Sequence, residues 1–260
     1  AEDRHGETLA GIGLGHALHS LGRWHEAEQQ LELAVKLARN IGFSRGALKA
    51  LAELAALHLD QGRLELAGRL LDGCLKSCRA RGMRQLEALT LLRLGDLHRL
   101  RRDQERAEMT YEEALALQQS LGANRTAAQT CFALGRLLYE QGDEDRARSL
   151  LEEAERLTAD FRLDRPGPLP KLYLALLERK PPAQLLIPER CPVMAQVEGY
   201  YLLHRVHAPG DPLGKALELL EGIAEGLDDE DRDLFWSASP VARSVRRAAR
   251  GRREDTSAAL

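Results

Sequence analysis

The stretch GHALHSLGRWHEAEQQLELAVKLARNIG, residues 15–42, decides the fold because its pattern returns every 40 residues. Gly15 is followed on this grid by Gly95 and Gly135, with Ala55 in the second unit. Four further columns read Gly22, Gly62, Arg102, Gly142; Ala27, Ala67, Ala107, Ala147; Leu31, Leu71, Tyr111, Leu151; and Ala34, Cys74, Ala114, Ala154. Columns that agree over four units without a gap indicate four copies of one structural unit.

Each unit is predicted to be a pair of antiparallel α-helices. Gly22 lies between two runs with apolar periodicity, where a helix ends and the left-handed backbone conformation favours glycine. In the second run, Ala27, Leu31 and Ala34 follow the spacing of one face of an amphipathic helix. Small residues at Gly15 and Ala27 predict helices that cross closely, because a larger side chain would push them apart.

These columns resemble the tetratricopeptide repeat (TPR), whose features Gly15, Gly22, Ala27, Leu31 and Ala34 match in order and spacing. The usual TPR has 34 residues. The longer unit here is similar to the variant found in the regulatory arms of MalT-like bacterial signalling ATPases. The resemblance covers roughly residues 4–160. It implies an all-α fold, a right-handed α-solenoid of TPR helical hairpins with a helical C-terminal cap, whose first helices line a concave binding surface.

The repeat register fails after residue 160, where Pro166, Pro168 and Pro170 interrupt the chain. We expect four repeats over residues 4–162, a Pro-rich irregular connector with a short helix over 163–191, a degenerate fifth repeat with capping helices over 192–250, and a disordered tail over 251–260. The C-terminal hundred residues are assigned mainly to capping, because a solenoid needs a terminal unit to cover its last apolar face.

The composition supports a helical protein and limits its partners. The chain has 260 residues, of which 44% are hydrophobic, 30% charged and only 4% aromatic, and its net charge is −3. A core of Leu and Ala favours helix over sheet. No apolar run of about 20 residues occurs, which argues against a membrane-spanning helix. The near-neutral charge argues against general nucleic-acid binding.

Four cysteines are too few for a fold held by disulfides, and the N-terminal residues lack the apolar segment of a secretion signal. Both observations predict a reducing, cytoplasmic environment. Because the chain starts at Ala1 without an initiator methionine, we expect a fragment of a longer polypeptide.

The resemblance places the concave surface at a mixed set of charged and aromatic side chains. Its inner-face positions carried over to this chain are His16, His19, Lys49, Asp96, Arg99, Gln129, Phe132, Arg136, Tyr139 and Glu140, together with Ile12, Ala56, Leu59, Asp60 and Leu92. Arg99 and Arg136 would suit the acidic or carboxylate end of a peptide or partner helix, with Phe132 and Tyr139 as aromatic anchors. An ordinary solvated helix face, or a partner segment within the same polypeptide, is an equally open alternative.

Other candidate sites are better explained by packing. His16 and His19 lie one turn apart, but no third ligand for a metal is near them in sequence. His58 and His98 share a repeat column and are predicted to pack between helices, as are Cys74 and Cys78 as small buried residues. No nucleotide-binding loop, nucleophile elbow or zinc-protease motif is present. The chain is therefore predicted to be no enzyme and to have no cofactor or metal site.

The leading functional interpretation is a protein-interaction scaffold, and more specifically the regulatory or sensor arm of a bacterial signalling protein with an ATPase or kinase domain upstream. The partner would be a protein or peptide segment, with no role for a membrane and with the oligomeric state open. The alternative is a nucleic-acid-associated regulator that uses the Arg-rich end: Arg243, Arg246, Arg247, Arg250, Arg252 and Arg253. That end lacks interleaved aromatic residues and a helix-turn-helix pattern, which disfavours the alternative.

Overall fold

The computed structural model describes residues 3–161, 167–179, 187–189 and 191–258, with the backbone alone for 253–258. These residues contain no strand. Their helices are α1 (Arg4–Ser20), α2 (Trp24–Asn40), α3 (Ser44–Gln61), α4 (Leu64–Ala80), α5 (Arg84–Leu100), α6 (Gln104–Ser120), α7 (Asn124–Gln141), α8 (Glu144–Phe161), α9 (Leu169–Glu178), α10 (Val193–Arg205), α11 (Pro212–Glu225), α12 (Asp229–Ala238) and α13 (Pro240–Ala258).

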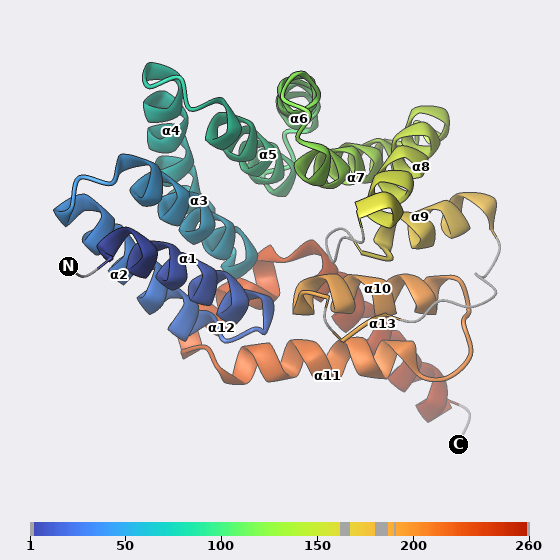
Figure 1. The fold of residues 1–260 in the computed structure, drawn as a ribbon. Helices are drawn as coiled ribbons and strands as arrows, with labels where there is room; N and C mark the ends of the chain where they lie inside the picture. Colours follow the sequence, from blue (N-terminus) through green and yellow to red (C-terminus); the bar gives the residue numbers. More distant parts are fainter. Residues whose placement is uncertain (1–2, 162–166, 180–186, 190, 259–260) are drawn as a thin grey trace.

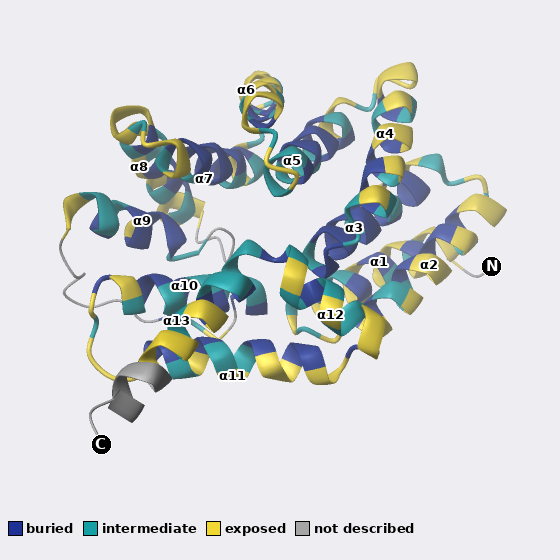
Figure 2. Ribbon diagram, turned by 180° about the vertical axis from the view of Figure 1, so that it is seen from behind, coloured by how far each residue is buried: buried dark blue, intermediate teal, exposed yellow. Residues whose placement is uncertain are grey.

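The first eight helices form the predicted hairpins, and the all-α solenoid is confirmed. Within each unit the two helices pack on each other, and each second helix packs on the first helix of the next unit. The first helices α1, α3, α5 and α7 also contact one another in sequence order. Figure 1 shows the result as an arc of hairpins that runs from α1 to α8. In Figure 2 the exposed residues of α4 and α6 lie on the outer side of this arc.

The small-residue columns mark close helix crossings, as the sequence predicted. A Cβ atom added to Gly15 would lie 2.6 Å from Leu31 Cγ, which is closer than side chains approach in proteins. A Cβ atom on Gly95 would overlap the ring of Tyr111. Ala107 and Tyr111 are fully buried. Small residues in this column therefore let the two helices of a unit pack around a large residue of the second helix.

The turn column shows why glycine recurs between the two helices of a unit. Gly22, Gly62 and Gly142 have φ angles of 81°, 84° and 86°, in the left-handed region. In the third unit Arg102 adopts the same conformation with a φ of 62°. A side chain with a Cβ atom is strained there, and glycine is not.

The C-terminal helices do more than the predicted capping of the last repeat. Helix α9 packs on α7 and α8, and α10 packs on α9. Leu169, Leu172 and Leu202 share one apolar cluster with Phe132 and Leu151 of the fourth unit. The short helix α9 thus continues the solenoid within the stretch assigned to the connector.

Helices α11–α13, by contrast, return to the first two repeats and close the arc. The largest apolar cluster of the described residues joins Trp24, Leu31 and Leu57 to Leu220 and Phe235. The rings of Trp24 and Phe235 meet edge to face with centroids 5.3 Å apart. Figure 1 shows α10–α13 lying across the open side of the arc.

Turn residues and one arginine complete this closing interface. A Cβ atom on Gly22 would lie 3.2 Å from Ile223 of α11, and one on Gly62 would overlap Ala238 of α12. The guanidinium of Arg63 pairs with Glu28 at 2.9 Å and also with Asp231. The turns of the first two units thus support α11 and α12 directly.

The last helix extends further than the sequence indicated. The backbone of α13 is helical over residues 251–258, within the stretch for which a disordered tail was predicted. Arg252 donates to Asp211 at 2.6 Å, which ties this part of α13 to the start of α11. An ion pair of this kind favours the ordered form of an otherwise polar helix end.

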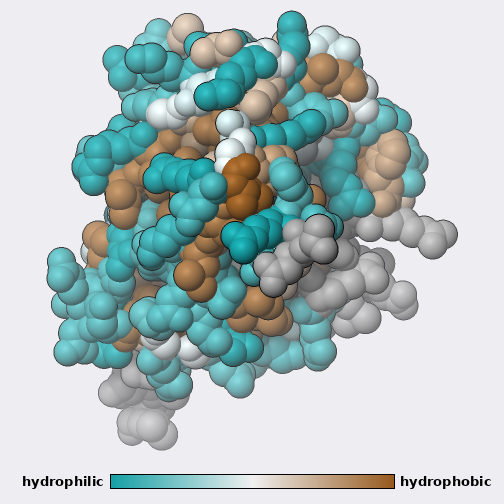
Figure 3. Space-filling view, turned by 60° about the vertical axis from the view of Figure 1, so that its left-hand side comes forward, coloured by the Kyte–Doolittle hydropathy of each residue, from teal (hydrophilic) through white to brown (hydrophobic). Residues whose placement is uncertain are grey.

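The surface seen in Figure 3 is mostly hydrophilic, with smaller apolar patches between the charged side chains. Among the described residues, no helix is long and apolar enough to cross a membrane.

The first prediction tests the column assignment. Ala107→Arg should lower the free energy of unfolding by several kcal/mol, because it forces a long charged side chain into a fully buried crossing. Met109→Arg, on the exposed side of the same helix, should change it by less than about 0.5 kcal/mol. Urea unfolding followed by circular dichroism measures both, and equal stability of the two variants would contradict the assignment.

The second prediction concerns the turn of the third unit. Arg102→Gly should raise the free energy of unfolding by about 1 kcal/mol, because it relieves the strained left-handed conformation. Arg102→Ala removes the same exposed side chain but keeps the Cβ atom, so it should give no such gain. Thermal melts of both variants provide the measurement. A gain of equal size in the alanine variant would assign the effect to the side chain instead of the backbone.

Candidate functional site

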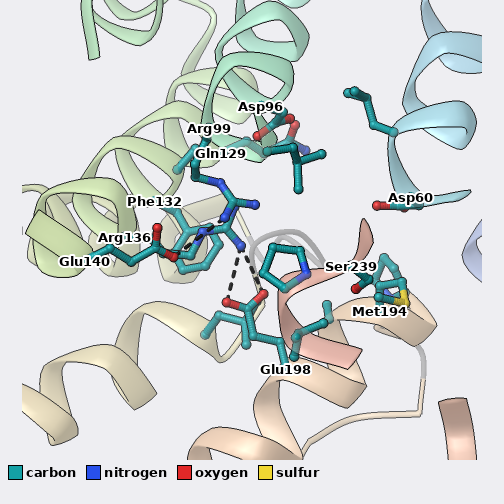
Figure 4. A pocket seen from close by; sticks show the side chains of 18 of the residues that line it. Asp60, Asp96, Arg99, Gln129, Phe132, Arg136, Glu140, Met194, Glu198 and Ser239 are labelled. Atoms are coloured by element: carbon teal, nitrogen blue, oxygen red, sulfur yellow. Dashed lines mark hydrogen bonds and ion pairs between the residues drawn. The ribbon is translucent and has the colours of Figure 1, made fainter. Parts of the chain in front are cut away.

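A pocket of about 360 Å³ lies between the concave surface and the closing helices, and we call it the central pocket. Helices α3, α5 and α7 supply one wall, and α9, α10 and the start of α13 supply the other. Figure 4 shows charged side chains from both walls pointing into the same space. The pocket therefore exists only because the C-terminal helices fold back across the arc.

Most of the inner-face residues predicted from the sequence meet in this pocket. Its lining includes His19, Asp96, Arg99, Gln129, Phe132, Arg136, Tyr139 and Glu140, and also Ala56, Leu59, Asp60 and Leu92. Lys49 is exposed and lies outside the lining, as does His16, whose side chain is 45% exposed and pairs with Glu53. Ile12 is buried in the core between the first two units. The first unit thus contributes little to the pocket.

Arg136 already has a partner within the chain. Its guanidinium lies 3.1 Å and 3.2 Å from the two carboxylate oxygens of Glu198 on α10. The hydroxyl of Tyr173 on α9 donates to the same carboxylate at 2.7 Å. Burial would by itself lower the pKa of Arg136, but the charge of Glu198 raises it well above the ordinary value. Burial, followed by the charge of Glu198, raises the pKa of Tyr173.

Arg99 is far less well paired. Its nearest carboxylate is that of Glu140, at 3.6 Å from Nη1, which is too long for a strong charge-assisted hydrogen bond. Its Nε is buried and has no hydrogen-bond partner. A buried donor without a partner costs free energy unless a ligand or water satisfies it. Figure 4 shows Arg99 beside Arg136, with Glu140 and Glu198 facing the pair.

The aromatic residues of the pocket pack on one another. Tyr173 lies edge to face against Phe132, with centroids 5.8 Å apart, and against Tyr139, with centroids 5.3 Å apart. The guanidinium of Arg136 lies 5.2 Å from the centre of the Phe132 ring. Phe132 is 7% exposed, so a ligand would meet the edge of this cluster rather than an isolated aromatic anchor.

A second group of charges lies at the α1–α3–α5 side of the pocket. Nε2 of His19 is 2.8 Å from Asp60, and Nδ1 of His16 is 3.2 Å from Glu53. Arg93 pairs with Asp96 at 3.4 Å. The two histidines thus bind different carboxylates of α3 and do not converge. In the part of the chain that the structure describes, no three His, Cys, Asp or Glu residues could hold a metal ion.

Glu53 of this group is a strongly perturbed carboxylate. Burial would raise its pKa, but the hydrogen bond with His16 and the charge of Arg93 outweigh burial and lower the pKa to about 2. His16, His19 and Arg93 surround it. Glu53 is therefore an anion that holds these three residues in place.

The remaining histidine and cysteine candidates from the sequence occupy buried or half-buried positions in the packed helices. His58 is buried and lies 2.9 Å from Gln61, and burial lowers the pKa of both His58 and His98. The cysteines Cys74, Cys78, Cys131 and Cys191 are all buried and form no disulfide. Burial raises the pKa of Cys74 and of Cys131 to about 12, so these thiols are poor nucleophiles.

The arginines of the C-terminal end are partly engaged within the chain. Arg246 stacks on Trp236 with the guanidinium 4.7 Å from the ring centre, and Arg252 pairs with Asp211. The side chain of Arg253 lies outside the described residues.

The sequence missed the half of the pocket that comes from α9, α10 and α13. Glu198, Tyr173, Met194 and Tyr201 all line it. A helix over 193–207 was expected. Which of its residues would face the concave surface was not predicted, because they do not fall in the columns of the repeat. The available signal was the pair Arg99 and Arg136 on the predicted concave face, for which an acidic partner was expected.

Comparison with known proteins identifies the repeat. The model of the family described as MalT-like TPR region matches residues 2–179. No match was found among curated proteins.

Solved structures with this fold include a Rap protein complexed with competence and sporulation factor, at 17% identity over 95% of this chain and 66% of that one, with a TM-score of 0.61. The Rap conjugation gene regulator of plasmid pLS20, in complex with the Phr* peptide, matches at 16% identity over 95% and 65%, with a TM-score of 0.65. Aspartyl phosphate phosphatase F from Bacillus subtilis matches at 15% over 95% and 61%, with a TM-score of 0.58. The chain thus spans less than two thirds of these structures, and the likeness is one of fold.

The third prediction follows from Glu53. Its pKa is about 2 in the folded chain and about 4.3 in an unfolded one. Its contribution to stability is therefore fully present above about pH 5 and is lost as the pH falls towards 2. Glu53→Gln cannot titrate, so its free energy of unfolding should fall less between pH 5 and pH 2, by on the order of 3 kcal/mol.

Urea unfolding at several pH values provides the measurement, with Glu225→Gln, an exposed residue, as the control for loss of one carboxylate. Parallel pH profiles for wild type and Glu53→Gln would show that Glu53 is not held as an anion.

Proposed function

The chain belongs to the family of MalT-like TPR regions, and from this premise we propose that it binds the acidic or carboxylate end of a peptide segment in the central pocket. A TPR-type solenoid is in general a scaffold for protein interactions. The observation that carries the proposal is Arg99, whose guanidinium is largely buried in the pocket wall and lacks a close acidic partner. A carboxylate can accept two parallel hydrogen bonds from such a guanidinium.

The size of the pocket supports a short ligand. Ligand pockets typically have volumes of about 300–1,000 Å³, and the central pocket, at about 360 Å³, fits the end of a peptide better than a long segment. The edge of the Tyr139–Tyr173 pair would contact an apolar side chain next to the bound carboxylate. Two of the solved structures of similar fold are complexes, one with competence and sporulation factor and one with the Phr* peptide, which is consistent with this choice.

At the level of the whole protein, we propose that the chain is the regulatory or sensor arm of a larger bacterial signalling protein in the cytoplasm. The long repeat and the family support this role. We assign it no catalytic activity, although one protein of similar fold is a phosphatase by its description. The basis is the chemistry of the pocket, where His19 pairs with Asp60, Arg93 with Asp96 and Arg136 with Glu198.

Nucleic-acid binding through the Arg-rich end is the rival proposal. The stacking of Arg246 on Trp236 and the Arg252–Asp211 pair leave fewer guanidinium groups for phosphates than the sequence suggested. Binding of a DNA duplex that is lost when Arg243, Arg247 and Arg250 are changed to Gln would favour this rival.

The fourth prediction tests the binding proposal with peptides that differ only at the C-terminus. A library of short peptides with free C-terminal carboxylates should contain binders, and their amidated forms should bind at least about tenfold more weakly. Arg99→Gln should weaken the free-acid peptides by a similar factor. Fluorescence anisotropy with labelled peptides measures both effects.

Arg101→Gln is the matched control, because Arg101 has an ion pair with Glu65 and does not line the pocket. Equal binding of acid and amide forms, or unchanged binding by Arg99→Gln, would overturn the proposal. Arg136 is not a suitable test position, since its loss would leave Glu198 buried without its partner.

A further inference from the structure

A second concavity lies on the outer side of the solenoid, between the second helices of the first two units. It has a volume of about 480 Å³, and we call it the α2–α4 groove. Ala47, Leu48 and Leu51 of α3 form part of its floor, and Leu70 of α4 adds to it. The groove is remote from the central pocket in its lining, since the two share no residue.

The charges around the groove are all of one sign. Its lining contains Arg39 at the end of α2, Arg69 in α4 and Arg81 just after α4, and it contains no acidic residue. The side chains of all three arginines are exposed. Within the described residues, none of these three side chains forms an ion pair or a hydrogen bond. Three guanidinium groups around one apolar floor therefore face solvent without a carboxylate.

Comparison with the next repeat unit shows which acidic partners Arg39 lacks. On the 40-residue grid, Arg39 of the first unit corresponds to Arg79 of the second. Arg79 pairs with Glu87 at 3.0 Å and with Glu113 at 2.5 Å, and so bridges α4 to α5 and α6. One unit earlier, the positions of Glu87 and Glu113 are held by Ala47 and Gly73. Both lie in the α2–α4 groove, so Arg39 has lost both acids that its equivalent uses.

The groove between α6 and α8, further along the outer side, is also bridged by ion pairs. Arg146 of α8 pairs with Glu108 at 2.8 Å and with Glu112 at 3.1 Å, both on α6. The first two units do share one bridge, Arg63 to Glu28, but both residues lie outside the lining of the groove. The α2–α4 groove thus differs from its neighbours in the absence of carboxylates that join its two walls.

Gly73 leaves space in this groove, although glycine lowers the stability of helix α4. It lies inside α4, and a Cβ atom there would meet nothing within 4 Å. Its φ angle is not positive, so the backbone does not require glycine. Glycine within a helix is less favourable than alanine. Neither packing nor backbone geometry accounts for this residue, whereas room for a bound side chain does.

We propose that the α2–α4 groove binds an acidic amphipathic helix of a partner protein. Its carboxylates would lie beside Arg39 where Glu87 and Glu113 lie beside Arg79, and its apolar side chains would lie on the floor formed by Leu48 and Leu51. A helix presents acidic and apolar residues three or four positions apart, which matches a floor flanked by cations. Nucleic acid fits less well, because the lining offers no aromatic side chain on which a base can stack.

The experiment is a selection from a library of displayed helical peptides, carried out on the whole 260-residue chain. Binders to a variant with Arg39, Arg69 and Arg81 all changed to Gln are removed first, so that the peptides that remain depend on the groove. We expect these peptides to carry Asp or Glu three or four positions from Leu or Ile.

Gly73→Glu supplies the missing carboxylate from within the chain. It should weaken the selected peptides at least about tenfold, because the new side chain competes for Arg39. Gly73→Gln has nearly the same size and no charge, so it should weaken them less. A variant with Arg125, Arg247 and Arg250 changed to Gln removes the same total charge elsewhere and should bind normally. Thermal melts check that both Gly73 variants stay folded, as their better helix propensity predicts.

A selection that yields no groove-dependent peptides, or peptides without acidic residues, would overturn the proposal. Peptides that bind Gly73→Glu as tightly as wild type would do the same, since they would not use Arg39. Groove-dependent binding of a single-stranded 20-nucleotide DNA in place of acidic peptides would assign the groove to nucleic acid instead.

Discussion

The packing of α11–α13 against the first two repeats is the constraint on which the rest of this structure depends. Trp24 and Phe235 are the large buried side chains at its centre, and the turns at Gly22 and Gly62 allow the C-terminal helices to approach. Without this interface the concave surface would be an open, solvated face. With it, the same face becomes one wall of a pocket in which charges pair across two distant parts of the chain. Architecture and candidate site therefore have the same physical origin.

The repeat units could be predicted from the sequence because their contacts are local and periodic. Ala27, Ala107 and the other small residues recur every 40 positions, and each position contacts a partner in its own or the next hairpin. The closing interface joins residues as far apart in the sequence as Trp24 and Phe235. These residues do not recur at the 40-residue spacing, so the repeat pattern could not predict their contact. The lining of the candidate site could likewise be predicted only in part. The family resemblance placed Arg99 and Glu140 on the inner face, whereas Glu198 and Tyr173 could be placed there only once the closure was known.

Two of the carried-over positions show the limit of the family pattern. His16 and Lys49 occupy inner-face positions, yet neither lines the central pocket, because His16 of the first unit pairs with Glu53 of α3 and Lys49 of the second unit is exposed. On the outer side of the solenoid, the departure from the repeat is visible in the sequence, but its consequence is not. The sequence shows Arg39, Ala47 and Gly73 directly. That Arg39 lacks two acidic partners becomes evident only from the ion pairs that Arg79 forms one unit later. A departure from a repeat is informative where the structure shows what the other units do at the same place.

The most direct test of the account is a distance measurement across the closing interface. Nitroxide labels at Leu21→Cys, at the end of α1, and at Glu221→Cys, in α11, are both exposed and lie next to the contact of Gly22 with Ile223. The native cysteines are buried and should not be labelled. Pulsed electron spin resonance should give one short, narrow distance distribution. A broad distribution at long distance would show an open solenoid and would contradict both the closure and the central pocket.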